Sequence, residues 1–254
     1  MAFSDELLDL DYLIYSSHKT GTQTLRATLG QNGFRCLHFH GLKNIGLEAG
    51  DFSPWLSAYR EKHRKPLKVI TVFREPIERH ISSFFQAHGS RPLRLGEVQH
   101  ESETIVARYT MDELHQRFIA ELKERTLIGL PDAMDEIARE LSLPLSAFSF
   151  DPESGMGRYN TEALSLTMLR FDQLFSNFDR LLAEAIGKPL QQHNVNIGDQ
   201  KWYREIYKEF KRTVRIPEDV IVDAYEHKKN LIELFYRGRY RALLQSALEK
   251  YSVR

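Results

Sequence analysis

The stretch YLIYSSHKTGTQTL, residues 12–25, decides the fold of this chain. Its apolar and aromatic start predicts a short buried strand over 11–16, and a helix is expected from about Gly21 to Leu29. A strand that runs through a polar turn into a helix leaves several backbone N–H groups, and the positive end of the helix dipole, facing one spot. Anions bind at such spots, so we predict that this turn holds a phosphate.

The side chains of the turn fit that prediction. Gly21 lets a ligand approach the backbone closely, Thr22 and Thr24 offer hydroxyl donors, and Lys19 adds a mobile positive charge. The alternative is an ordinary helix entry with a surface lysine and threonine caps.

The common nucleotide-hydrolase loop is not present. That loop has the pattern G-x-x-x-x-G-K-[ST]. When the chain is aligned on Lys19 and Thr20, Leu13 and His18 stand where the two glycines belong.

The rest of the chain alternates strands with helices. Further strands are predicted at 34–40, 66–73 and 164–171, and the apolar run PLKVITVF is typical of a central parallel strand. We expect a three-layer α/β fold with a mostly parallel central sheet, flanking helices and a helical C-terminal region. The predicted helices cover 51–65, 74–88, 111–125, 132–141, 177–187, 201–214, 218–235 and 239–251.

We interpret residues 1–254 as a single domain with an insertion at 87–150. The stretch 90–103 is predicted to be a loop, and FDPESGMGRYN, residues 150–160, is predicted to be a turn. Both the insertion and this turn are expected to shape the cleft for a second substrate, because such folds vary their specificity there.

A second candidate anion-binding motif follows the strand predicted at 66–73. Arg74 stands at the carboxyl end of that strand, where open α/β sheets bind ligands, and Ser82 comes two helical turns later. A guanidinium fork and a hydroxyl can hold one phosphate together. Alternatively, both side chains pair with nearby carbonyls or with Glu75. Two candidate anion-binding motifs after neighbouring strands indicate a ligand with two separated phosphates.

Composition narrows the class of protein. Lysine plus arginine equals aspartate plus glutamate, 35 each, which argues against a wholly basic nucleic-acid binder. One cysteine excludes an intrachain disulfide. No run of about 18 apolar residues predicts a membrane span. The acidic N-terminal stretch lacks an apolar signal core, so a cytoplasmic protein is expected.

These motifs resemble those of sulfotransferases. HKTGTQTL is similar to their 5′-phosphosulfate loop, and REPIERHIS, residues 74–82, is similar to their 3′-phosphate motif, with Pro76 two residues and Ser82 eight residues after Arg74. LTMLRFDQLFSNFDRLLAEAIG, residues 166–187, resembles their later strand and helix.

A further stretch, NIGDQKWYREIYKEFK, resembles the signature of a bacterial family assigned to capsular polysaccharide synthesis and named for an Asn-Lys-Trp-Tyr-Ser run. This chain departs from that run, since Gln200 precedes Lys201 and Arg204 follows Tyr203.

The resemblance implies a phosphate-loop NTPase-like fold and the donor 3′-phosphoadenosine 5′-phosphosulfate, with adenosine 3′,5′-bisphosphate as product and no metal. Lys19 would stabilise the charge that develops on the bridging oxygen. Arg74 and Ser82 would hold the 3′-phosphate. The loop residues implied to bind the 5′-phosphosulfate are Lys19, Thr20, Gly21, Thr22, Gln23 and Thr24.

The acceptor must lose a proton, and the family uses a His or a Glu as the base. His40 is the first candidate and His38 the second, because they share one side of the predicted strand and His40 is nearer its carboxyl end. The alternatives for this pair are a histidine bonded to a carbonyl at the edge of the core, or a metal pair. Glu48 and Glu75 are outside candidates.

The resemblance also implies that Lys201 closes over the donor from a late basic loop. The implied activity is sulfuryl transfer to a glycan hydroxyl, on a capsular or cell-surface saccharide precursor, with an association with a polysaccharide-assembly complex. A nucleotide-dependent kinase and a non-catalytic capsule-biosynthesis partner remain as alternatives.

Overall fold

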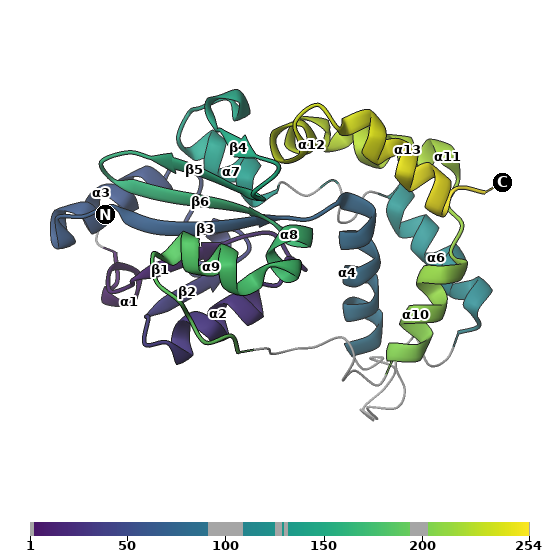
Figure 1. Ribbon diagram of the computed structural model, residues 1–254, viewed down its shortest axis with the longest axis horizontal. Helices are drawn as coiled ribbons and strands as arrows, with labels where there is room; N and C mark the ends of the chain where they lie inside the picture. Colours follow the sequence, from purple (N-terminus) through teal and green to yellow (C-terminus); the bar gives the residue numbers. More distant parts are fainter. Residues whose placement is uncertain (1–2, 91–108, 125–128, 130–131, 194–202, 254) are drawn as a thin grey trace. The chain divides into compact units, whose positions relative to one another are not determined.

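A computed structural model describes residues 3–90, 109–124, 129, 132–193 and 203–253 (Figure 1). The chain divides into two compact units. The first comprises Met1–Arg74, Pro131–Asn196 and Asn230–Gly238, and the second comprises Glu75–Leu130, Ile197–Lys229 and Arg239–Arg254.

The first unit is built on a six-stranded sheet in the order β2-β1-β3-β6-β5-β4. β1, β2, β3 and β6 run parallel, whereas β5 is antiparallel to both β6 and β4. This confirms the predicted α/β fold with a mostly parallel sheet and the four predicted strands. The strands are β1 Tyr12–Tyr15, β2 Cys36–Phe39, β3 Leu67–Phe73, β4 Phe150–Asp151, β5 Met156–Asn160 and β6 Leu164–Arg170.

The prediction of a turn over 150–160 was wrong, because this stretch forms β4, a tight turn and β5. The Asp151 carboxylate accepts from the N–H groups of Glu153 and Ser154 and closes the turn. Gly157 allows close packing, since a Cβ there would lie 2.5 Å from the Ser149 carbonyl oxygen. The Gly and Pro residues of this stretch, which are typical of loops, therefore lie within an antiparallel hairpin and its turn.

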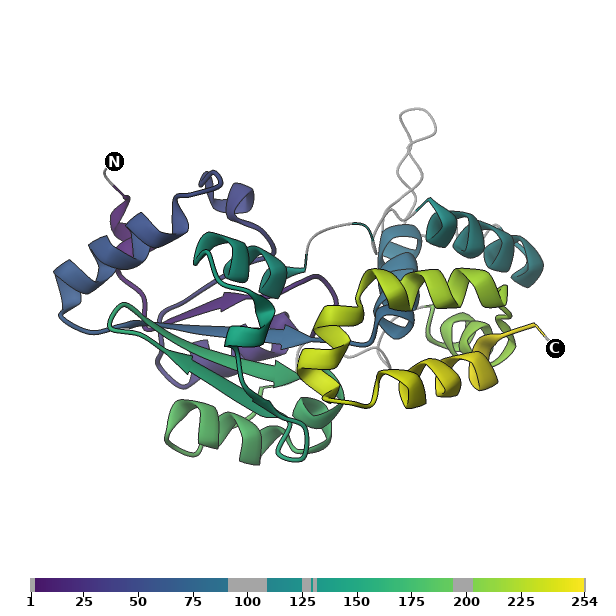
Figure 2. The same cartoon turned by 90° about the horizontal axis from the view of Figure 1, so that it is seen from above.

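Helices cover both faces of this sheet (Figure 2). On one face, Ile14, Ile70 and Val72 belong to a buried cluster with residues of α2 and α9. On the other face, Tyr15 packs against Phe52 of α3, and Phe73 stacks on Phe235 of α12 at 4.7 Å. The helices that contribute to this unit are α1 Asp5–Leu8, α2 Thr22–Gln31, α3 Phe52–His63, α7 Ala133–Glu140, α8 Phe171–Ser176, α9 Phe178–Ile186 and α12 Lys229–Tyr236, with 3-10 turns at Leu42–Ile45 and Leu145–Ala147.

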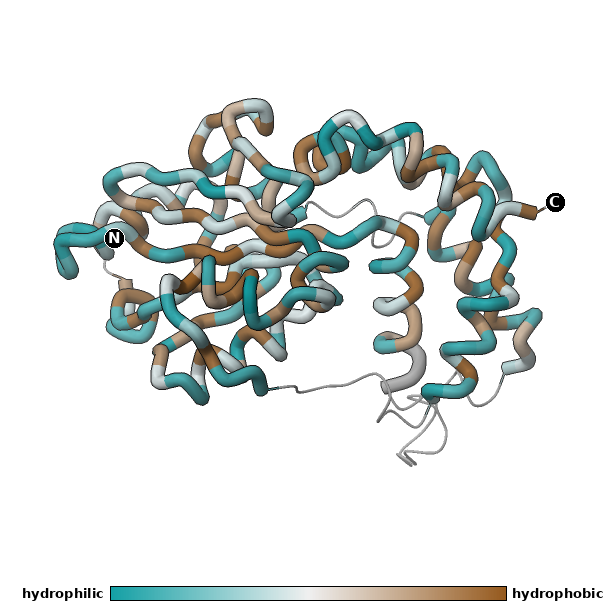
Figure 3. The backbone as a smooth tube through the Cα atoms, in the orientation of Figure 1, coloured by the Kyte–Doolittle hydropathy of each residue, from teal (hydrophilic) through white to brown (hydrophobic). Residues whose placement is uncertain are grey.

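Apolar residues follow the central strands (Figure 3). In β3 every residue except Lys68 is buried, because helices occupy both faces. The sequence therefore shows a continuous apolar run there instead of the alternation of a half-exposed strand.

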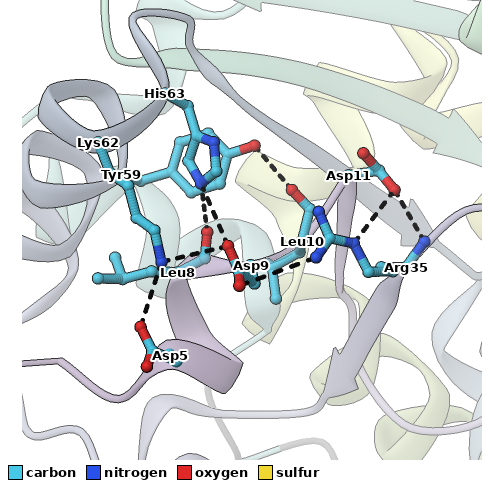
Figure 4. Close-up of polar contacts among 9 residues, drawn as sticks. All are labelled: Asp5, Leu8, Asp9, Leu10, Asp11, Arg35, Tyr59, Lys62 and His63. Atoms are coloured by element: carbon cyan, nitrogen blue, oxygen red, sulfur yellow. Dashed lines mark hydrogen bonds and ion pairs between the residues drawn. The ribbon is translucent and has the colours of Figure 1, made fainter.

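Polar contacts tie the start of the chain to α3 (Figure 4). The Tyr59 hydroxyl donates to the Leu10 carbonyl at 2.7 Å, and His63 Nε2 lies 2.7 Å from the Leu8 carbonyl oxygen. Lys62 forms ion pairs with Asp5 and Asp9, both at 3.2 Å. These contacts satisfy carbonyls just before β1 and fix where that strand begins.

The second unit is helical. It comprises α4 Pro76–Ser90, α6 Met111–Lys123, α10 Arg204–Thr213, α11 Glu218–His227 and α13 Tyr240–Tyr251. Phe84, Phe118 and Phe210 form its aromatic centre, with ring centroids 5.3–5.8 Å apart. The Glu78 carboxylate joins three helices, because it accepts from Lys211 and Lys250 at 2.7 Å and from the Tyr251 hydroxyl.

Glu78 ionises unusually easily. Burial alone would raise its pKa, but the hydrogen bonds from Lys211, Lys250 and Tyr251 outweigh burial and bring the pKa to about 2. The carboxylate therefore stays charged wherever the protein is folded at ordinary pH.

One predicted helix, 218–235, is two helices in the structure. α11 ends at His227, Lys228 leaves the helical conformation, and α12 begins at Lys229. The apolar residues of α11 are buried in the second unit and most of α12 belongs to the first. One straight helix cannot bury its apolar stripe in two cores.

The region predicted as an insertion contributes to both units. α6 belongs to the second unit, while α7 and β4 belong to the first. None of the helices in the described ranges is long and apolar enough to cross a membrane.

His80 generates a prediction about acid stability. Its side chain on α4 is 2 % exposed, packs at 5.0 Å from the Phe118 ring, and neither ring nitrogen has a hydrogen-bond partner among the described residues. Burial, with a smaller contribution from Arg79, lowers the pKa of His80 to about 4, although Glu121 opposes the shift. Between pH 6.5 and 4 the unfolded chain therefore binds more protons, and stability falls as the pH is lowered.

We expect the free energy of unfolding of His80→Leu to vary less between pH 6.5 and 4 than that of the wild type. The difference in this pH dependence should reach up to about 3 kcal/mol. Chemical denaturation at several pH values measures it, with exposed His227→Leu as the matched control. An unchanged slope in His80→Leu would contradict the assignment.

Candidate anion-binding site

The loop after β1 is held by Ser16. Its Oγ accepts from the Val72 N–H at 3.0 Å, lies 2.9 Å from the Val72 carbonyl oxygen, and lies 2.8 Å from Thr20 Oγ1. The paired residues of β1 and β3 are Leu13 with Val69 and Ile14 with Ile70. The Ser16 side chain thus continues the contact between the two strands beyond their backbone ladder, and the loop leaves the sheet from a fixed point.

Two left-handed residues turn the loop into α2. Lys19 has φ 65° and Gly21 has φ 78°. Gly21 is the N-cap of α2, so no side chain caps the helix, and no acidic residue stands in its first turn. The positive end of the helix is therefore not neutralised by its own residues, which is the arrangement that favours an anion.

The remaining loop residues are placed differently from one another. Thr20, Thr22 and Thr24 are buried, and Gln23 is exposed. The Thr20 hydroxyl donates to the Ser17 carbonyl at 2.7 Å, so this side chain shapes the loop. Its predicted role as a ligand contact rests on its backbone N–H.

Arg74 contacts the same loop. Its Nη1 donates to the Lys19 carbonyl at 2.9 Å, and its guanidinium lies 4.2 Å from the centroid of the Phe171 ring. The alternative of a bond to a nearby carbonyl is thus realised. The contact also brings a positive charge to the loop that carries Lys19, while the predicted role of Arg74 at a second phosphate stays a prediction.

Two predicted site residues are not joined to this loop by the structure. Ser82 lies on α4 in the second unit, so its partnership with Arg74 stays a prediction. Lys201 lies outside the described residues.

An aromatic pair from α8 covers the loop and was missed by sequence reasoning. A Cβ on Gly21 would lie 2.3 Å from ring atoms of Phe175, and the φ of 78° also favours glycine there. Phe171 and Phe175 pack together at 4.8 Å, and Phe175 is 37 % exposed. Their signal was a pair of aromatic residues four apart, directly after the end of a strand.

His40 lies beside the loop in a defined tautomer. Its Nδ1 is 2.6 Å from the Ser16 carbonyl oxygen. A carbonyl only accepts, so Nδ1 carries the proton and Nε2 of the neutral ring is an acceptor. The carbonyl-bonded alternative is therefore what the structure shows.

The pKa values of both predicted base candidates are lowered. Burial and the nearby Lys19 charge lower the pKa of His40, while the bond to Ser16 opposes them. Burial first, and then His40, Arg26 and His18, lower the pKa of His38 to about 4. His38 Nε2 is buried and has no hydrogen-bond partner among the described residues, so His38 is the poorer base.

His18 completes a row of three imidazoles and was also missed. Its ring centroid is 3.7 Å from that of His40, which in turn is 4.5 Å from that of His38. The His40 ring therefore contacts both the His18 ring and the His38 ring. Within the described ranges, no group of three or more His, Cys, Asp or Glu side chains is arranged to hold a metal ion.

α7 contacts the loop from the region predicted as an insertion. The Ala133 N–H donates to Ser17 Oγ at 3.0 Å, and Glu136 accepts from the buried Tyr15 hydroxyl. The start of α7 is therefore fixed to the end of β1. The expectation that the insertion shapes the acceptor cleft stays a prediction.

The two outside candidates for the base have other roles. Glu75 accepts from the N–H groups of Ile77 and Glu78, at 2.9 and 2.6 Å, and so caps α4. Glu48 pairs with Lys43 at the surface. Burial raises the pKa of Glu75, although its bonds to these N–H groups oppose the shift, and both candidates stay predictions.

Comparison with family models, with curated proteins and with solved structures gives no match for this chain.

The site generates a prediction about His40. We expect Lys19→Met to raise the pKa of His40, because the cation that disfavours the imidazolium is removed. An NMR titration of the His40 ring measures this without any substrate. Lys43→Met, which removes an exposed lysine from the turn after β2, is the matched control. A His40 pKa that stays or falls in Lys19→Met would show that Lys19 does not act on this ring.

Proposed function

We propose that this chain is a sulfotransferase that moves a sulfuryl group from 3′-phosphoadenosine 5′-phosphosulfate to a hydroxyl of a glycan. The proposal is supported above all by two contacts of Ser16, one made by its side chain and one by its carbonyl. Its hydroxyl holds the anion loop to β3, and its carbonyl holds His40 as a neutral base. An anion site and a proton acceptor are thereby fixed to the same residue.

The loop suits the 5′-phosphosulfate end of the donor. The uncapped start of α2 offers N–H groups from 20 to 24, and Gly21 carries no Cβ. The donor supplies an activated sulfuryl group. Lys19 stabilises the negative charge that grows on the bridging oxygen as the sulfur–oxygen bond breaks.

His40 suits the acceptor end of the reaction. Nε2 takes the proton of the acceptor hydroxyl while the oxygen of that hydroxyl bonds to sulfur. The resulting imidazolium keeps its Nδ1–H on the Ser16 carbonyl, which stabilises the new charge. The His18 and His38 rings contact the His40 ring.

The 3′-phosphate is assigned to Arg74 and Ser82, and Lys201 is proposed to close over the donor. Arg74 already contacts the loop backbone. The glycan acceptor, the capsular or cell-surface saccharide and the assembly complex rest on the resemblance of the motifs, as does the cytoplasmic location.

The donor assignment predicts a preference for a 3′-phosphate. Adenosine 3′,5′-bisphosphate should bind about 10–100-fold more tightly than 5′-AMP, because charge-assisted hydrogen bonds contribute about 1.5–3 kcal/mol. Calorimetric titration of the purified protein measures both affinities. Equal affinities would exclude this donor, and preferential binding of ATP with magnesium would favour a kinase.

Two variants separate the contacts. Ser82→Ala should weaken only the bisphosphate and leave 5′-AMP unchanged. Arg74→Ala should weaken both ligands, because Arg74 also bonds the Lys19 carbonyl of the 5′-phosphate loop.

The assignment of His40 as the base predicts that kcat/KM falls at acidic pH. With the donor and a saccharide acceptor, kcat/KM should fall as the pH drops through the lowered pKa of His40, below 6.5. His40→Gln should reduce kcat by about 10²–10⁴-fold with donor affinity retained. His38→Gln should have the smaller effect. Turnover in His40→Gln at the wild-type rate would place the base elsewhere.

A further inference from the structure

A pocket of about 660 Å³ lies in the first unit, away from the anion loop. It is lined by the 3-10 turn at Leu145–Ala147, the start of β4 and one side of α12. Its volume falls within the roughly 300–1,000 Å³ of small-molecule sites. α12 lies beside β4 (Figure 1). The rings of Phe235 and Phe150 are 4.9 Å apart.

The pocket and His40 lie on opposite faces of the sheet. His38 pairs with Ile14, whose side chain belongs to the cluster with α2, and His40 points the same way two residues later. Phe73 contacts α12 and follows Val72, which belongs to the α2 cluster, so it points to the other face. A molecule in the pocket is therefore not at the reacting atoms.

The lining combines an apolar floor with a polar rim. Phe148 and Phe150 are buried beneath it, and Leu145 and Leu234 are half-buried. The rim is exposed and carries one carboxylate, one guanidinium, an amide and hydroxyls, from Glu233, Arg237, Asn230, Ser146 and Ser149. One positive and one negative charge cancel, so neither an anion nor a cation is favoured.

Arg237 stands at this rim in a costly conformation. Its φ is 26°, in the region that favours glycine, and the next residue, Gly238, has φ 71°. The Glu233 carboxylate accepts from the Gly238 N–H at 3.0 Å, and the Glu233 carbonyl accepts from the Arg237 N–H at 3.0 Å. The turn thus holds an exposed arginine at the pocket where a glycine would be less strained.

We propose that this pocket is a second, non-catalytic subsite for a neutral saccharide. A sugar ring offers an apolar C–H face for Leu145 and Leu234, and hydroxyls that both donate and accept. Paired donors and acceptors on the rim, without net charge, match that chemistry. The inference does not require the proposed sulfuryl transfer, and its test uses no donor.

The test is an NMR titration of the full chain with maltotriose and N,N′,N″-triacetylchitotriose as neutral probes. A hyaluronan tetrasaccharide and a glucosamine trimer are the anionic and cationic comparisons. At least one neutral probe should shift the backbone amides of Ser146, Ser149 and Asn230 more than the charged probes do. No shift with either neutral probe at about 10 mM, or a preference for a charged probe, would overturn the proposal.

Two variants locate the binding. Leu234→Trp should fill the pocket and weaken the neutral probe at least tenfold, whereas Leu244→Trp, at another half-buried leucine outside the lining, should not. Arg237→Gly should bind more weakly while its melting temperature stays level or rises, because the strained φ is relieved. Unchanged affinity in both Leu234→Trp and Arg237→Gly would overturn the proposal even if a probe binds.

Discussion

The pair of contacts made by Ser16 is the constraint on which the candidate site depends. The side chain is fully buried, its Oγ contacts Val72 of β3, and its carbonyl accepts from His40 after β2. Three adjacent strands therefore meet at one residue just beyond the carboxyl ends of a parallel sheet. Open α/β sheets place ligands at that edge.

Electrostatics at this edge favour an anion beside a neutral base. Lys19, Arg74 and the positive end of α2 place positive charge at the loop. Burial, and to a smaller extent Lys19, lower the pKa of His40, which favours the neutral ring. A buried imidazole keeps an acceptor nitrogen without an ion pair.

The packing around the loop explains residues that look unremarkable in sequence. Gly21 is favoured because its φ is 78° and the Phe175 ring lies where a Cβ would be. The Phe171 ring lies 4.2 Å from the Arg74 guanidinium. α8, which supplies both rings, follows directly on β6. The aromatic pair therefore links the third predicted motif, after residue 166, to the first two.

By itself, the sequence determined the α/β class, the four parallel strands, the strand-loop-helix unit around Lys19, and the two histidines on one side of β2, because these follow from local periodicity and turn chemistry. The hairpin of β4 and β5, the break at Lys228, and the positions of His18 and Phe175 were decided only by tertiary structure. The glycine-containing stretch 150–160 forms strands only because the backbone of β5 pairs with the edge of β6. A helix breaks when its two halves bury their apolar residues in different cores. Rings far apart in sequence meet only because the sheet brings its strand ends together.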